Sequence, residues 1–188
     1  MIPPLIKHCE DHFGSIVSGW STDAAGVRLP FQVALFEKSP LPGVRILCTL
    51  GLSNVPLRFG QGPRMLRQEL VALFREVEGF GSLPGILQQL GNEALEKDAA
   101  YILGDVIGPR GALRAGATVS AFYVALPVYL PDSFHVCRST PEPVVFAWMV
   151  PITDTEAAFA RTCGRHAFES IVESTDPNLL DTSRESIV

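Results

Sequence analysis

The stretch that decides the fold is Val144-Val-Phe-Ala-Trp-Met-Val-Pro-Ile-Thr-Asp-Thr-Glu156. Its first seven residues are apolar without interruption, which is typical of a strand that is buried on both faces of a sheet. The end of the stretch, Thr153-Asp-Thr-Glu156, has the capping-box pattern that opens a helix, which we expect to run to about Arg161. A buried strand that leads directly into a helix indicates an α+β fold.

Further strands are expected on both sides of this stretch. Thr118 to Leu126 is a second strongly apolar run. Phe31 to Glu37 alternates apolar residues, and Val44 to Leu50 follows it after a turn rich in Pro and Gly. These two segments therefore predict neighbouring antiparallel strands. Shorter strand-like runs lie at residues 15–20 and 101–108.

Helices are expected near both ends of the chain and in its middle. Pro3-Pro4 opens a first helix, because a missing N–H costs nothing in the first turn. Leu83 to Asp98 has an amphipathic pattern, with Ser82 as its expected N-cap. Gly164 separates the helix after the capping box from a last helix.

The segment from Met65 to Val77 is ambiguous between helix and strand. Its leucines and Phe74 fall on one helical stripe, and most of its residues are good helix formers. With a period of two, Leu66 and Leu70 share one face of a strand with Gln68. Periodicity alone favours the helix, by about three to two.

Composition places the chain among globular proteins. Hydrophobic residues make up 47% and charged residues 19%, which excludes a disordered chain. A length of 188 residues suits one domain, so we expect a single domain over residues 1–188 with a short polar tail from about residue 178. The net charge of −5 and the lack of a clustered basic face argue against nucleic-acid binding.

The expected location is the cytoplasm. The first residues lack the pattern of a secretion signal, and no uncharged apolar stretch is long enough to predict a membrane span. The four cysteines are far apart in a chain of this size, so we expect reduced thiols: Cys9, Cys48, Cys137 and Cys163.

Common catalytic motifs are not found in the sequence. Gly51-Leu-Ser-Asn-Val55 lacks the second glycine of a nucleophile elbow, so Ser53 is not marked as a nucleophile. The glycine-rich stretches miss the dinucleotide spacing, and there is no Gly-Lys-Ser/Thr phosphate loop. We therefore assign no catalytic residue and no cofactor, and expect that the chain is not an enzyme.

Histidines and cysteines suggest an alternative function for the chain, that of a metal-binding protein. His8-Cys-x-x-His12 places two imidazoles on one helical face, and His135-x-Cys137 and Cys163-x-x-His166 offer further zinc ligands. The three pairs match no standard zinc spacing, which favours buried cysteines and surface histidines. A nucleophilic Cys163 paired with a histidine also stays open.

Several segments together are similar to the suppressor-of-fused-like domain family. Val144 to Glu156 resembles the strand-to-helix signature (F/L)xLVPLTxxE of that family. The other matching segments are Thr49-Leu-Gly-Leu-Ser-Asn-Val-Pro56, Glu69-Leu70, Gly104-Asp105, Gly164-Arg-His-Ala-Phe-Glu169 and Asp181-x-x-Arg-Glu-Ser-Ile-Val188. Their order and spacing extend the resemblance from the Val44 strand to the last residue.

The resemblance implies a fold and a function. The fold is an α+β sandwich with a mixed, mainly antiparallel sheet flanked by helices, like the N-terminal domain of the long animal member. It also implies that Met65 to Arg75 is a strand. That long member is a cytoplasmic inhibitor that sequesters a transcription factor, whereas short bacterial relatives look like immunity proteins that bind a cognate toxin. The resemblance thus implies a non-enzymatic protein-binding module, an immunity protein or, alternatively, an intracellular regulator or scaffold.

The loop from Asn54 to Arg67 is the expected partner-binding surface. It contains a basic run without an acid and departs from the family pattern, so contacts cannot be copied across from a relative. The alternative is a solvated loop whose phenylalanine packs onto the core. The candidate contacts are Asn54, Arg58, Phe59, Arg64 and Arg67, together with Asp105 as a possible partner for an arginine.

Overall fold

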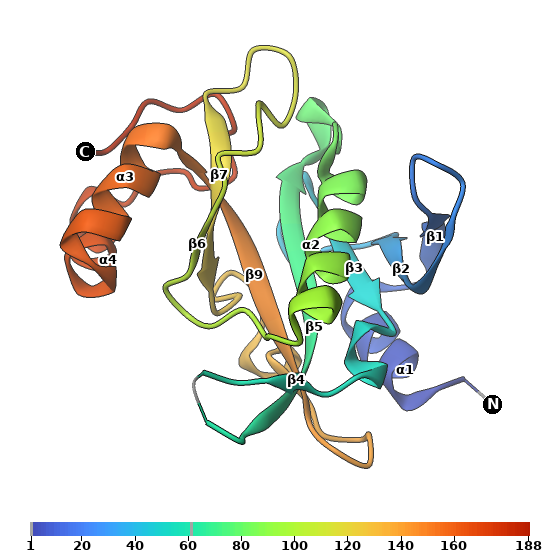
Figure 1. Cartoon of the computed structure of the whole chain (residues 1–188). Helices are drawn as coiled ribbons and strands as arrows, with labels where there is room; N and C mark the ends of the chain where they lie inside the picture. The colour runs from blue at the N-terminus through green and yellow to red at the C-terminus, as the bar shows by residue number, and fades with distance from the viewer. Residues whose placement is uncertain (1, 61) are drawn as a thin grey trace.

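The apolar segments come together in one mixed sheet with helices on both faces, in a computed structural model that describes residues 2–60 and 62–188 (Figure 1). In chain order the elements are α1 (Pro4–Phe13), β1 (Ile16–Thr22), β2 (Arg28–Phe36), β3 (Val44–Leu50), η1 (Leu52–Asn54), β4 (Leu57–Arg58), β5 (Met65–Arg75), η2 (Glu76–Glu78), α2 (Leu83–Lys97), β6 (Val106–Ile107), β7 (Val119–Ala125), η3 (Asp132–Phe134), β8 (Val136–Cys137), β9 (Val144–Thr153), α3 (Asp154–Cys163) and α4 (Arg165–Thr175). None of the helices in these ranges has the length and apolarity needed to cross a bilayer.

The strands pair in the order β1-β2-β3-β5-β9-β7-β6, with β4 beside β5 and β8 beside β9. β5 and β9 run parallel, whereas the other described pairs are antiparallel. The predicted fold class, a mixed and mainly antiparallel sheet flanked by helices, is therefore confirmed.

The sheet divides the interior into two cores. α2 covers one face, against β2, β3 and β5, and the other three helices lie on the opposite face. β9 contributes to both cores because alternate residues of a strand point to opposite faces. Trp148, Val150 and Ile152 point to the side of α3, and Ala147 and Met149 point to the side of α2.

The predicted capping box connects β9 to α3. The hydroxyl oxygen of Thr153 accepts from the backbone N–H of Glu156 at 3.2 Å. The Glu156 carboxylate accepts in return from the backbone N–H of Thr153 at 2.9 Å. The helix therefore begins where the sequence predicts, because both interactions are local.

The ambiguous segment from Met65 is a strand, β5, so the helix favoured by periodicity is wrong and the strand implied by the resemblance is confirmed. β5 lies between β3 and β9, and residues 68–74 are all buried. A strand that is covered on both faces has no need of alternating polar residues. Its apolar residues therefore match a helical stripe by coincidence.

Two local expectations need comment. Ser82 is the N-cap residue of α2, as predicted, but its side chain makes no capping bond, because its hydroxyl donates to the carbonyl of Leu113 at 2.8 Å. The run from residue 101 to 108 forms a strand only at β6. Its first residue, Tyr101, is held instead by the buried Gln68 side chain, through bonds of 2.8 and 3.0 Å to the Tyr101 backbone.

The last residues pack on the molecule, where a polar tail was expected from about residue 178. Leu179 and Leu180 are buried in the core on the side of α3 and α4. Arg184 is also buried and forms an ion pair with the fully buried Glu156, with a contact of 2.7 Å from Nη2. Local sequence does not reveal this packing, because Arg184 and its buried partner Glu156 lie far apart along the chain.

Candidate protein-binding surface

β4 and the first residues of β5 form a hairpin that projects from one end of the sheet (Figure 1). Leu57 pairs with Leu66, and the N–H of Phe59 donates to the carbonyl of Arg64 at 2.8 Å. Leu57 is fully buried, whereas residues 58–60 and 62–65 are exposed; Gln61 lies outside the described residues. The hairpin therefore has a base anchored in the core and an exposed tip.

Two of the arginines predicted to meet a partner are held by the chain itself. Arg58 Nε lies 2.9 Å from Oδ2 of Asp98 and also donates to the carbonyl of Asp98. Arg67 donates to two carbonyls of the η1 turn at 2.7 and 2.9 Å and pairs with Glu142. These contacts hold the hairpin against the rest of the fold.

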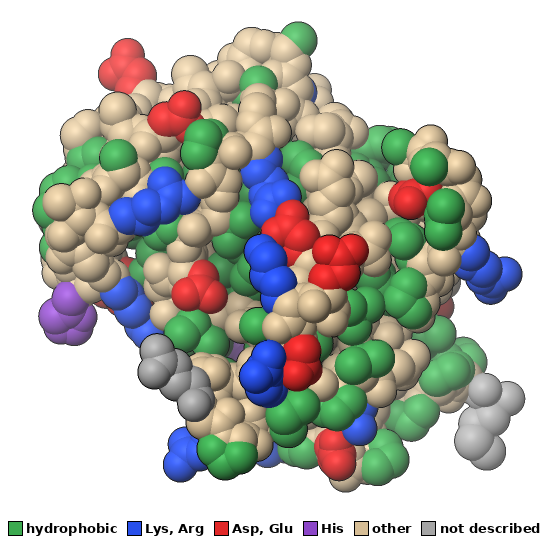
Figure 2. Space-filling view, viewed as in Figure 1, with side chains coloured by type: hydrophobic (Ala, Val, Ile, Leu, Met, Phe, Trp, Pro, Cys, Tyr) green, Lys and Arg blue, Asp and Glu red, His purple; other side chains and the backbone are tan. Residues whose placement is uncertain are grey.

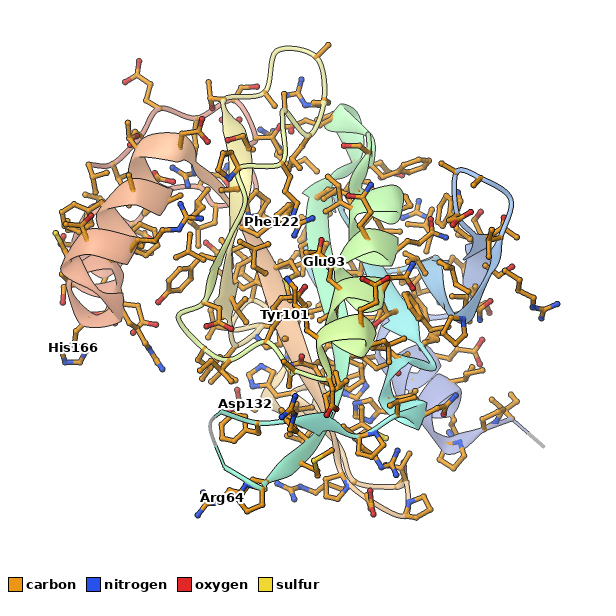
Figure 3. The ribbon with its side chains drawn as sticks, viewed as in Figure 1. Arg64, Glu93, Tyr101, Phe122, Asp132 and His166 are labelled. Atoms are coloured by element: carbon orange, nitrogen blue, oxygen red, sulfur yellow. The ribbon has the colours of Figure 1, made fainter. Side chains whose placement is uncertain are left out.

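The other predicted residues of the tip are directed to solvent. Arg64 points away from the ribbon (Figure 3) and forms no ion pair with any residue that the structure describes. Phe59 is 41% exposed, so it is not packed onto the core as the alternative held. Met65 is 50% exposed beside them and was not among the predicted contacts, although the resemblance places it at the start of a strand.

Asn54 and Asp105 lie in different surroundings. Asn54 is exposed at the end of η1, next to the hairpin. Asp105 closes a turn before β6, with its Oδ2 accepting from the N–H of Ile102 at 2.9 Å. It lines a separate cavity with Glu93 and Arg110 and forms no ion pair within the described residues. The structure therefore does not bring Asp105 into the hairpin surface.

A buried carboxylate lies beneath the hairpin and holds the turn beside it. Glu69 accepts from the hydroxyl of Thr49 at 2.6 Å, from Gly51 N–H at 2.9 Å, and from the Ser53 N–H and hydroxyl at 3.1 and 2.7 Å. Burial raises the pKa of Glu69 to about 7, although these four bonds oppose the shift. Glu69 thus fixes the η1 turn that receives Arg67, a role that was not predicted from the sequence.

The histidines and cysteines considered as metal ligands do not meet. His8 stacks on Phe134, with ring centroids 5.6 Å apart, and its neighbour His12 lies 4.8 Å away. Cys163 and His166 are exposed at the junction of α3 and α4 (Figure 3). Within residues 2–60 and 62–188, no three His, Cys, Asp or Glu side chains are grouped closely enough to hold a metal ion.

Charged side chains of both signs alternate on the face of the molecule that carries α2 (Figure 2). Glu93 accepts two bonds from Arg110, at 2.5 and 2.8 Å, and one from Lys97 at 3.2 Å. Hydrogen bonding from Arg110 lowers the pKa of Glu93. Because these charges compensate one another, this face offers no continuous basic patch of the kind that binds phosphates.

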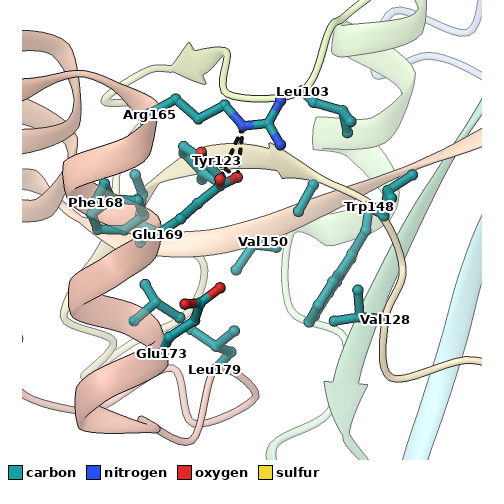
Figure 4. Close-up of a pocket in the computed structure, with 14 residues that line it drawn as sticks. Leu103, Tyr123, Val128, Trp148, Val150, Arg165, Phe168, Glu169, Glu173 and Leu179 are labelled. Atoms are coloured by element: carbon teal, nitrogen blue, oxygen red, sulfur yellow. Dashed lines mark hydrogen bonds and ion pairs between the residues drawn. The ribbon is translucent and has the colours of Figure 1, made fainter.

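A second surface feature, which the sequence did not predict, is an apolar groove between α4 and the sheet (Figure 4). Its volume is about 310 Å³. Strands β7 and β9 form the floor and α4 forms one wall, so the groove depends on residues far apart in the chain. Its lining includes Leu103, Tyr123, Leu126, Val128, Trp148, Arg165, Phe168, Glu169 and Glu173.

Comparison with known structures reproduces this fold. A putative SUFU (suppressor of fused protein) homologue from Neisseria gonorrhoeae FA 1090 has a TM-score of 0.77 at 20% sequence identity, over 98% of this chain and 95% of that chain. A structure described as the Sufu–Fu complex has a TM-score of 0.70 at 17% identity, over 97% and 90% of the two chains. Drosophila Suppressor of Fused has a TM-score of 0.71 at 16% identity, over 97% of this chain and 50% of its own.

Sequence comparison agrees with the structures. No curated protein sequence matches the chain. The profile of the family described as Suppressor of fused protein (SUFU) matches residues 28–185, from the start of β2 to the buried C-terminal segment. This chain therefore belongs to the suppressor of fused family.

Proposed function

We propose that this chain is a protein-binding module with no catalytic activity of its own, which acts by covering a surface of another protein. The observation that carries the proposal is the hairpin tip, where Phe59, Arg64 and Met65 stand in solvent on a base anchored in the core. Aromatic and arginine side chains are the commonest anchors of protein interfaces. The Sufu–Fu complex supports the proposal, because a protein of this fold engages a protein partner there.

We propose further that the partner is a cognate toxin and that the chain is an immunity protein acting in the cytoplasm. The support is the resemblance to short bacterial relatives, together with the match to 95% of a bacterial homologue but to only 50% of the Drosophila protein. Neutralisation by occlusion needs no catalytic group in the inhibitor. It needs an exposed set of anchors, and the hairpin carries exposed Phe59, Arg64 and Met65 on a buried base.

A second candidate is an intracellular regulator or scaffold that sequesters another protein. The complex of Sufu with Fu favours it, since a protein of this fold is bound there to another protein. The two candidates share the same kind of surface and differ in the consequence of binding. Only the immunity protein protects a cell from a toxin.

The test is co-expression of the chain with each candidate toxin domain encoded by the genes that flank its own. We expect wild-type chain to restore growth, and Phe59→Ser with Arg64→Glu to abolish protection while leaving Tm unchanged, because both residues are exposed. A matched control changes Phe80, which is 39% exposed, and the exposed Arg28 in the same way.

The outcomes separate the parts of the proposal. Growth arrest in the presence of wild-type chain would refute the immunity function. Full protection by the hairpin variant would refute the surface. Equal loss of protection in the control variant would also count against it, because the effect would then not be specific to the hairpin.

A further inference from the structure

A cavity between the β1–β2 turn and the start of α2 takes no part in the proposed function. Its volume of about 690 Å³ lies within the range of small-molecule binding sites. Its lining includes the aromatic rings of Trp20 and Phe80 and the amide side chains of Gln88, Gln89 and Asn92. A ligand that matches this lining has an apolar face and several neutral hydrogen-bonding groups.

The aromatic side of the cavity is held in place from the core. The ring of the buried Phe74 packs edge-to-face on that of Phe80, with centroids 6.2 Å apart. Phe80 in turn packs edge-to-face on Trp20 at 5.3 Å. Phe80 nevertheless stays 39% exposed, so this packing orients the rings without covering them. The two outer rings therefore offer an apolar surface to one face of a ligand.

One buried side chain of the cavity keeps an unused acceptor. Gln88 is 7% exposed, and its Nε2 donates to the carbonyls of Trp20 and Thr22 at 3.3 and 2.9 Å. Because both carbonyls can only accept, the amide atom that faces them is the nitrogen and the other is the oxygen. That oxygen, Oε1, accepts no bond within residues 2–60 and 62–188, and the protein does not enclose it. It is therefore an oriented acceptor for a donor from a ligand in the cavity that Gln88 lines.

The charge of the cavity lining selects against anions. Asp23 is the one charged side chain among the described residues that line it. Its Oδ1 already accepts from the N–H groups of Ala25 and Val27, at 2.9 and 2.8 Å. A phosphate or carboxylate would meet no cationic side chain in this lining to offset its desolvation. The ligand class that fits is thus neutral.

We propose that this cavity binds a neutral saccharide with a glucose-type ring, which has C–H groups on its faces and hydroxyls around its edge. One face of the ring lies against Trp20 and Phe80, and an edge hydroxyl donates to Oε1 of Gln88. Further hydroxyls pair with the amides of Gln89 and Asn92, since a hydroxyl both donates and accepts. The cavity shares no residue with the hairpin, so this inference is independent of the proposed function.

An NMR titration of the whole chain with cellotriose and with chitotriose, two neutral trisaccharides of this type, tests the proposal. The chain has two tryptophans, Trp20 at the cavity and Trp148 in the core on the other face of the sheet. A Trp20→Phe variant assigns their indole N–H resonances. We expect one or both trisaccharides to move the Trp20 resonance with a Kd of about 1 mM or tighter, and to leave that of Trp148 in place. Sorbitol, which has hydroxyls but no ring, is the control and should move neither.

Two variants locate the ligand. Gly85 is exposed at the cavity, and no group beyond its neighbours in α2 lies within 4 Å of the position that a Cβ would take. Gly85→Met should therefore fill the cavity and abolish binding without lowering Tm, since Met is the better helix former. Phe80→Ala should weaken binding about fivefold or more. Phe59→Ala is the matched control, because its ring is 41% exposed against 39% for Phe80, and it should leave binding unchanged.

Several outcomes overturn the proposal. These are an unmoved Trp20 resonance with both trisaccharides at about 10 mM, an equal shift with sorbitol, and unchanged affinity in Gly85→Met. A Trp20 shift produced by a polyproline peptide and by neither trisaccharide would assign the cavity to a protein segment instead. If Gly85→Met does not fold, the comparison of Phe80→Ala with Phe59→Ala still decides. Protection from the toxin should survive Phe80→Ala, because the hairpin is intact, so failure here is distinct from failure of the proposed function.

Discussion

Glu69 is a buried acid whose hydrogen bonds reach the turn beside the hairpin. Its carboxyl is fully buried, and burial raises its pKa from 4.5 to about 7. Between these values the folded chain holds a proton that the unfolded chain has lost. The free energy of unfolding therefore falls as pH rises through this window, by up to about 3 kcal/mol.

Replacement of Glu69 by Gln removes this titration. We expect the unfolding free energy of Glu69→Gln to depend less on pH than that of the wild type between about pH 5 and pH 7.5. Urea unfolding at both ends of the range measures the difference. Glu96→Gln on the exposed face of α2 is the control and should keep the wild-type slope. Equal slopes for wild type and Glu69→Gln would contradict the raised pKa.

The individual residues predicted to bind a partner show what local sequence can reveal. The basic run could be identified in the sequence, and Arg64 and Phe59 are indeed exposed at the tip of the hairpin. Which arginines form ion pairs could not be predicted, because the ion-pair partners of Arg58 and Arg67 lie 40 and 75 positions away. Pairing of that kind depends on the tertiary fold.

Elements differ in how far local sequence determines them. α3 begins at its predicted residue because its capping box lies within four residues. β5 was misjudged by periodicity because both of its faces are buried, so its residues do not need to alternate between apolar and polar. The groove could not be predicted, since its floor and wall come from β7, β9 and α4.

The capping box gives a prediction for α3. Thr153→Ala removes the oxygen that accepts from Glu156 N–H, so we expect the unfolding free energy to fall by about 1 kcal/mol. Thr162→Ala, near the exposed end of the same helix, serves as the control and should change it by less than about 0.5 kcal/mol. Chemical denaturation measures both. Equal effects would mean that the cap does not stabilise the helix.

The C-terminal segment gives a prediction from its buried ion pair. Burial raises the pKa of Glu156, but bonds from Arg184 and from backbone N–H groups outweigh it and leave the pKa lowered. Because the pKa of Glu156 is lowered in the folded chain, its pair with Arg184 stabilises the fold at pH values above the pKa of the unfolded carboxyl. This stabilisation is lost as pH falls through the folded-state pKa.

Arg184→Met leaves the Glu156 charge buried without its partner. We expect the unfolding free energy to fall by roughly 3–5 kcal/mol at neutral pH, and the deficit to shrink in acid as the carboxyl is protonated. Arg64→Met at the exposed hairpin tip is the control and should have no such effect. A deficit below about 1 kcal/mol would indicate that the last residues act as the polar tail expected from sequence.

The whole molecule presents two surfaces, the hairpin and the groove, which are formed by different segments of the chain. The hairpin joins β4 to β5 and carries Arg64, whereas the groove lies along α4 and carries Glu173; neither side chain forms an ion pair within residues 2–60 and 62–188. The family and the fold class could be predicted because several motifs occur in the right order along the chain. The surfaces could not be predicted in full, because they depend on which side chains remain unpaired after folding.

The central claim is that the chain acts through its hairpin on another protein. Titration calorimetry with a candidate toxin domain, chosen from the genes that flank its own, tests it most directly. We predict a one-to-one complex with a submicromolar Kd, weakened about tenfold or more by Phe59→Ser with Arg64→Glu at unchanged Tm. An absence of binding heat with the wild-type chain, or an unchanged Kd in the hairpin variant, would contradict the claim.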